Sequence, residues 1–148
     1  MKRTIWIGAS ALVLAFACNA FAGDKEDVAA AVNKVIKDFN VKDYPAYFAA
    51  FTSDFDAFTT GTTPLRYDAA SWKVFIEGLS KLAFVDYQQQ DNVIRILSGN
   101  TAIVSGYYVF KVMPQGGTMV VENGRASIVM VKQSGKWLIT HNHFSKLF

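Results

Sequence analysis

The chain has 148 residues, of which 51% are hydrophobic, 14% are aromatic and 18% are charged. It contains one cysteine, which excludes internal disulfides, so a hydrophobic core must stabilise a chain whose length suits one domain. The formal net charge of +3 includes Lys2 and Arg3, and no basic cluster follows them that would indicate nucleic acid or an anionic membrane as a partner.

Residues 1–22 have the pattern of a secretory signal peptide. Lys2 and Arg3 precede an apolar run over residues 5–17, and an Ala-Phe-Ala site at residues 20–22 precedes Gly23, so we expect cleavage after Ala22. The run is too short to favour a transmembrane helix. Cys18 raises the alternative of a lipoprotein, which the residues before it disfavour.

A chain cleaved at this site would be periplasmic or secreted and would have no membrane anchor. Removing 22 of the 148 residues leaves 126, and the loss of Lys2 and Arg3 lowers the net charge from +3 to +1. Residues 23–148 are expected to form a single domain.

Three helices are predicted in the first half of this domain. Asp24 can cap the first, whose apolar residues between 28 and 39 follow a helical spacing. Asp43 can cap a short second helix with Pro45 in its first turn and an inner face reaching Phe51. Asp68 can cap a third, with Trp72 on its apolar face.

The strands predicted from period-two patterns follow mainly after the third helix. A short strand over residues 54–58 and an irregular loop over residues 59–66 precede that helix. The later strands span residues 84–97, with an interruption, and then 101–113, 119–131 and 136–145. Asn123-Gly124 indicates either a bulge or the true start of its strand.

The last two strands form a hairpin whose register decides the arrangement of its polar residues. A three-residue loop over residues 133–135, with Gly135 in the left-handed region, would pair Arg125 with His143 and Ser127 with His141 on one face. A two-residue turn would instead pair Arg125 with Phe144 and would move both histidines to the other face.

This order of elements predicts an α+β domain in which three N-terminal helices pack on a curved antiparallel sheet. Such a sheet would form a cone with a pocket at its open end, unless large side chains fill it.

Several segments resemble the nuclear transport factor 2-like superfamily, in particular its SnoaL-like and polyketide-cyclase-like branch, over nearly the whole of residues 23–148. The likeness rests on Asn40-Val-Lys-Asp43, on residues 47–55, on Gly124-Arg-Ala-Ser127, and on residues 135–145. The resemblance implies the cone-shaped fold. It leaves the activity open, because this superfamily includes isomerases, cyclases, dehydratases and non-catalytic domains that bind ligands or oligomerise.

Arg125, His143 and His141 are the best candidates for binding a ligand, because a guanidinium holds oxyanions and an imidazole changes protonation near neutral pH. Trp137, Tyr107 and Trp72 could line the apolar remainder of a pocket. Only one of Tyr107 and Tyr108 can do so, because neighbouring strand residues face opposite sides. In the alternative, Arg125 pairs with an acidic residue and both histidines lie at a subunit interface.

We therefore expect an exported domain that binds a small apolar or carboxylated molecule, with no cofactor, and that forms a homodimer through the outer face of its sheet. The alternative is an isomerase, cyclase or lyase in which His143 or Asp54 acts as the base on an enolisable carbonyl substrate. Two histidines without a nearby cysteine or carboxylate do not favour a metal site. A third possibility is an assembly module whose cone is plugged by aromatic side chains.

Overall fold

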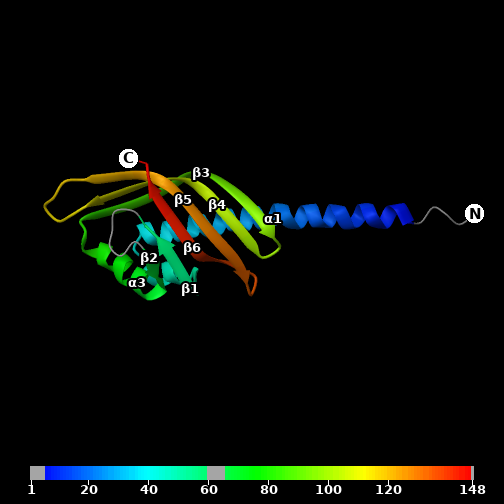
Figure 1. Ribbon diagram of the computed structural model, residues 1–148, viewed down its shortest axis with the longest axis horizontal. Helices are drawn as coiled ribbons and strands as arrows, with labels where there is room; N and C mark the ends of the chain where they lie inside the picture. The colour runs from blue at the N-terminus through cyan, green and yellow to red at the C-terminus, as the bar shows by residue number, and fades with distance from the viewer. Residues whose placement is uncertain (1–5, 60–65, 148) are drawn as a thin grey trace, which may run out of the picture.

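A computed structural model describes residues 6–59 and 66–147. Helices precede and interrupt a six-stranded sheet in an α+β arrangement, as predicted (Figure 1). The helices are α1 (Trp6–Asn40), α2 (Tyr44–Phe48) and α3 (Ala69–Gly78), and a 3₁₀ turn follows at Leu79–Lys81. The strands are β1 (Phe51–Phe58), β2 (Arg66–Asp68), β3 (Phe84–Ser98), β4 (Thr101–Met113), β5 (Val120–Gln133) and β6 (Lys136–Lys146).

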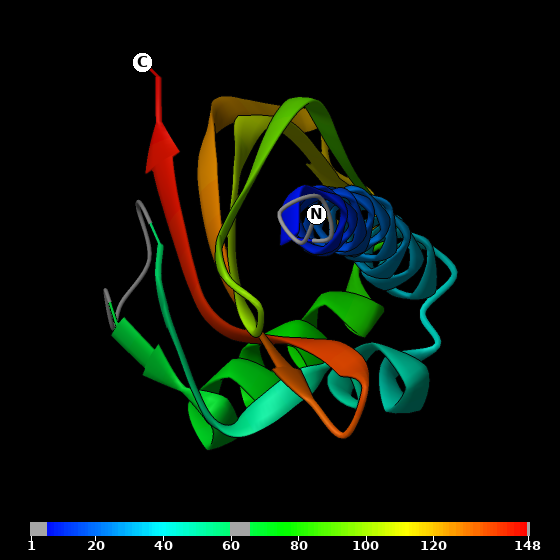
Figure 2. The same cartoon turned by 90° about the vertical axis from the view of Figure 1, so that its right-hand side faces the viewer.

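The sheet is open and strongly curved, with the strand order β2-β1-β6-β5-β4-β3. Figure 2 shows α1 running through its hollow, with α3 on the same side of the sheet. All neighbouring strands are antiparallel except β1 and β6, which pair in parallel. The sheet is therefore antiparallel, as expected, apart from this parallel pair, which joins the N-terminal strands to the end of the chain.

The predicted caps of α2 and α3 are confirmed. The Asp43 side chain accepts a hydrogen bond from the Ala46 amide at 3.2 Å, and Asp68 accepts one from the Ser71 amide at 2.8 Å. Each cap satisfies a backbone donor that the first helical turn leaves without a partner. Helix α2 ends at Phe48, so Phe51 begins β1 instead of continuing the helix.

Asp24 does not cap a helix, because α1 begins at Trp6 and continues through it. Its carboxylate lies 2.6 Å from the Lys132 Nζ on β5. At the other end of α1, the Asn40 amide donates to the Tyr87 carbonyl at 2.8 Å and accepts from the Tyr87 amide at 2.9 Å. These polar contacts hold α1 in the hollow of the sheet, where Val28 and Val32 are buried.

Within the described residues, no helix is both long enough and apolar enough to cross a membrane. Residues 60–65, which fall in the predicted loop over residues 59–66, lie outside the described part of the chain, as do residues 1–5 of the predicted signal peptide. Arg66 begins the short strand β2, which the sequence patterns did not predict.

Candidate functional site: an aromatic cavity inside the curved sheet

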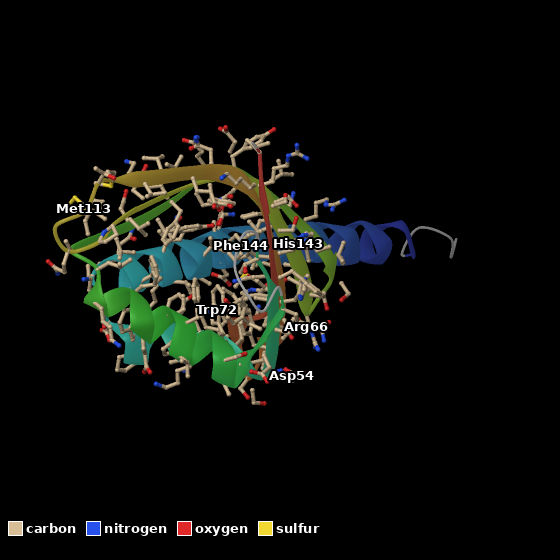
Figure 3. The ribbon with its side chains drawn as sticks, turned by 60° about the vertical axis from the view of Figure 1, so that its left-hand side comes forward. Asp54, Arg66, Trp72, Met113, His143 and Phe144 are labelled. Carbon is tan, nitrogen blue, oxygen red and sulfur yellow. The ribbon has the colours of Figure 1, made fainter. Side chains whose placement is uncertain are left out.

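A cavity of about 160 Å³ lies between α1, α3 and the concave face of the sheet. Its walls are mainly aromatic and aliphatic side chains. Trp72 of α3 and Phe144 of β6 are among them, with ring planes within 10° and centroids 6.4 Å apart (Figure 3). Apolar walls of this kind are typical of small-molecule sites. The other apolar lining residues are Val32, Val35, Ile36, Phe39, Phe51, Phe75, Ile76, Leu79, Phe110, Ile128 and Ile139.

Tyr108 of β4 lies across the inner face of β5 and reaches Glu122. Its hydroxyl donates a hydrogen bond to Glu122 Oε1 at 2.5 Å, and only 3% of the residue is exposed. The opposite residue is Gly124, where a Cβ would lie 2.3 Å from Tyr108 Cε1 and 2.5 Å from the carbonyl oxygen of Ser145. Glycine is therefore needed here because the aromatic ring occupies the space of a side chain.

Two further tyrosines add hydroxyl groups to the lining. The Tyr87 hydroxyl donates to Gln89 Oε1 at 3.1 Å. The indole N–H of Trp72 donates to the Tyr47 hydroxyl at 3.2 Å. Burial raises the pKa of both tyrosines above the usual value, because it disfavours the phenolate. These hydroxyls therefore stay protonated and act as hydrogen-bonding groups.

Asn142 of β6 is a polar lining residue with an unsatisfied atom. It is 4% exposed, and its Oδ1 has no hydrogen-bond partner in the described part of the chain. A buried acceptor without a partner costs about 1–3 kcal/mol. Rotation about its soft terminal torsion would let the carboxamide meet a hydrogen-bonding group of a ligand.

Glu122 gives the cavity its charge. Among the described lining residues it is the one carboxylate, and none of them is arginine, lysine or histidine. No described cation lies within ion-pair distance of Glu122. The cavity therefore joins an apolar interior to a single acidic group that Tyr108 orients.

The predicted register of the final hairpin is wrong. The loop has two residues, Ser134 and Gly135, with φ values of 49° and 78°, and Gln133 pairs with Lys136. Thr140 is an extra residue in β6 that forms a bulge. Beyond it, Arg125 pairs with Ser145 instead of His143, while the bulge returns the histidines to the face that carries Arg125.

That shared face is the outer, convex one. Arg125 and His143 are exposed, whereas their neighbours Gly124, Ala126 and Asn142 are buried on the inner side. Arg125, His141 and His143 are absent from the lining of the cavity. The structure thus brings the three predicted residues to one face of the sheet and separates them from the hollow.

His141 belongs to a polar network at the seam between β1 and β6. Its Nδ1 lies 2.5 Å from Asp56 Oδ1, and the other oxygen of Asp56 accepts from Arg66 Nε at 3.0 Å. The hydrogen bond with His141, and then that with Arg66, lower the pKa of Asp56 below its usual value. Phe58 packs edge-on against His141 and His143.

The remaining predicted site residues lie in different parts of the fold. Trp72 lines the cavity, whereas Tyr107 is 48% exposed on the outer face and its neighbour Tyr108 lines the cavity instead. Trp137 is buried outside the lining, beneath the Lys132 Nζ at 5.5 Å from its ring centroid. Asp54 borders a shallow depression shared with Asp56, Arg66 and Asp68 at the β1–β2 edge (Figure 3).

No group of three or more histidine, cysteine, aspartate or glutamate residues is placed to hold a metal within residues 6–59 and 66–147. Glu122, Tyr87, Gln89 and Asn142 line the cavity but were not predicted from the sequence. A signal for the inner face was present in β5, where Ala126, Ile128 and Met130 alternate with polar Arg125 and Ser127. That alternation indicates which side faces the core.

Comparison with known proteins supports this architecture. Solved structures with the same fold include a proposed scytalone dehydratase from Novosphingobium aromaticivorans, which is 11% identical with a TM-score of 0.80 over 88% of this chain and 89% of the other. A proposed dehydratase of the nuclear transport factor 2-like family from Streptomyces avermitilis is 15% identical, with a TM-score of 0.74 over 86% and 98%.

The association domain of the C. elegans calcium/calmodulin-dependent protein kinase II is 16% identical, with a TM-score of 0.68 over 84% of this chain and 96% of the other. At these identities the likeness shows the fold alone. A search of curated proteins gave no match. The model of the SnoaL-like domain matches residues 28–148. The chain therefore belongs to the SnoaL-like domain family.

Proposed function

We propose that this protein binds a small, mainly apolar molecule in the cavity between α1, α3 and the sheet. The observation that carries the proposal is the cavity itself: an aromatic hollow of about 160 Å³ with a few polar groups at defined positions. Burial of an apolar ligand against these walls contributes about 25 cal/mol per Å² of apolar surface removed from water. The polar groups orient the ligand.

The carboxylated ligand expected from Arg125 and His143 finds less support in this arrangement. Both residues lie on the convex face, and the described lining holds no cationic side chain to bind a carboxylate. We therefore propose that the ligand contacts Trp72, Tyr108 and Phe144 in the cavity.

Two substitutions on neighbouring residues of β5 test the site. Ile128→Phe adds volume to the cavity wall, whereas Val129→Phe adds the same ring to the outer face. We expect wild type and Val129→Phe to bind indole, a neutral aromatic probe, and Ile128→Phe to lose most of that binding in calorimetric titration. Retained indole binding by folded Ile128→Phe would contradict the proposal.

A second candidate function is general acid–base catalysis, which the Tyr108–Glu122 pair supports. A carboxylate base must lie within hydrogen-bond reach of the proton that it removes, and Glu122 is the one carboxylate among the described lining residues. His143 and Asp54 lie outside the lining. Turnover of an enolisable ketone panel by wild type, with loss in Glu122→Gln, would support catalysis; equal rates in both proteins would reject it.

We also propose that the protein is a homodimer joined through the outer face of its sheet. Exposed Tyr107 and Val121 lie on that face, and burying such apolar surface is the main driving force of association. Tyr107→Glu should halve the mass measured by light scattering, whereas Val74→Glu, on exposed α3, should leave it unchanged. A wild-type mass equal to that of one chain would refute the dimer.

The predicted export leads to a further proposal, namely that the mature protein begins at Gly23. Cleavage after Ala22 keeps Asp24, and with it the contact to Lys132 that holds α1 to β5. Intact mass spectrometry of protein from the periplasm or the medium should give the mass of residues 23–148. Full-length protein confined to the cytoplasm would oppose this proposal.

A further inference from the structure

We infer that the cavity selects a protonated amine, so that its ligand is an apolar molecule carrying one ammonium group. This inference rests on the proposed binding function and specifies the chemistry of the ligand. Its starting point is the chemistry of the lining, in which Glu122 is the one carboxylate among the residues that the structure describes. A ligand that supplies the missing positive charge complements this site better than a neutral or anionic one.

The geometry of Glu122 leaves one oxygen for such a ligand. Tyr108 donates to Oε1 at 2.5 Å, and no described residue donates a hydrogen bond to Oε2. The buried Tyr108 ring is itself fixed, because it stacks on Tyr87 with centroids 5.9 Å apart and meets Phe144 edge-on at 5.6 Å. The carboxylate is therefore oriented before a ligand arrives, which reduces the entropy lost on binding.

The walls around this carboxylate provide a second attraction for cations. Tyr87, Tyr108, Phe110 and Phe144 all line the cavity, and the negative face of an aromatic ring attracts ammonium groups. Neutral alcohols gain less from these ring faces, since they carry no charge. A carboxylated ligand would meet both Glu122 and the negative ring faces, so like-charge repulsion would oppose its binding.

Three probes of similar shape separate charge from hydrophobicity: phenethylamine, phenethyl alcohol and 3-phenylpropionate. At pH 7 the amine is protonated and the acid is ionised. Calorimetric titration of wild type should give an affinity for the amine about tenfold or more above that for the alcohol, as expected for a charge-assisted hydrogen bond. The propionate should bind more weakly than the alcohol.

Two acid-to-amide variants test the role of Glu122, one at the site and one as a control elsewhere. Glu122→Gln should lower amine affinity about tenfold or more and leave alcohol affinity nearly unchanged. Glu26→Gln removes the same charge at an exposed position of α1 and should change neither the amine affinity nor the alcohol affinity. Tyr108→Phe, which removes only the orienting hydroxyl, should reduce the preference for the amine and serves as a second test if Glu122→Gln does not fold.

Ionic strength gives an independent measurement on wild type. Added salt should weaken amine binding and leave alcohol binding nearly constant. Equal affinities for amine and alcohol, or tighter binding of the propionate, would overturn the ammonium assignment while the proposed ligand-binding function would stand. Failure of indole and of all three probes to bind would overturn both.

Discussion

Substitution of Gly124 by alanine tests how the cavity is built. The added Cβ would lie 2.3 Å from Tyr108 Cε1, 2.4 Å from Tyr108 Cζ and 2.5 Å from the Ser145 carbonyl oxygen. One neighbour is a packed ring and the other is backbone of the adjacent strand, so neither can move at small cost. Overpacking of this kind typically destabilises a protein by about 1–3 kcal/mol.

Urea denaturation should therefore show a free energy of unfolding about 1–3 kcal/mol lower for Gly124→Ala than for wild type. Gly99→Ala is the matched control, because a Cβ at that turn would meet nothing within 4 Å. In a double-mutant cycle with Tyr108→Ala, the two losses should be less than additive, since the ring is one of the two obstacles. A Gly124→Ala variant as stable as Gly99→Ala would refute the predicted close packing of Tyr108 over β5.

Two further predictions concern polar contacts outside the Tyr108–Glu122 pair. Tyr47→Phe leaves the buried Trp72 N–H without its acceptor, so the free energy of unfolding in urea should fall by about 1–3 kcal/mol, whereas Tyr107→Phe on the exposed face should have little effect. The folded state lowers the pKa of Asp56. The Asp56 carboxylate therefore stabilises the fold at pH values above the ordinary aspartate pKa, and this contribution is lost as the pH falls through the lowered pKa of the folded state. Asp56→Asn should thus be less stable than wild type at pH 6, by about 1 kcal/mol or less for such an exposed network, and the difference should shrink by pH 3; a difference that does not depend on pH would contradict this assignment.

The fold could be predicted because several local signals agreed with it. Asp43 and Asp68 cap their helices, and the apolar spacing of α3 places Trp72 and Ile76 in the core. Such caps and periodic patterns depend on residues close together in sequence, so a sequence alone displays them. The long strands β3 and β4 could be predicted for the same reason, because their period-two patterns are local in sequence.

The candidate site could not be predicted to the same extent, because it depends on register and on which face is concave. The Ser134-Gly135 turn places a serine at positive φ, a conformation that is uncommon for residues other than glycine, asparagine and aspartate. The bulge at Thr140 then shifts the pairing again. Neither feature has a strong sequence signal, and together they move the residue opposite Arg125 from His143 to Ser145.

Residues of one kind were also separated by the alternation of side chains between the two faces of the sheet. Tyr107 and Tyr108 are adjacent in sequence, yet the first faces solvent and the second forms part of the cavity. Lys111 lies two residues after Val109 and four after Tyr107, so the three share one face of β4. A lysine on that face indicates that it meets solvent. The outer face therefore carries the titratable histidines, while the inner face carries Glu122.

The aromatic composition of the cavity wall links its shape to its proposed ligand. Phe39 meets Tyr87, Tyr87 stacks on Tyr108, and Tyr108 meets Phe144, with centroids 5.6–6.3 Å apart. Large planar rings supported by one another cannot fill an irregular space as flexible methionine or leucine side chains can, so the hollow remains. Aliphatic substitutions that filled it would gain buried contacts but would remove the ring faces next to Glu122. The same rings that keep the cavity open therefore supply the surface on which a cationic ligand would be recognised.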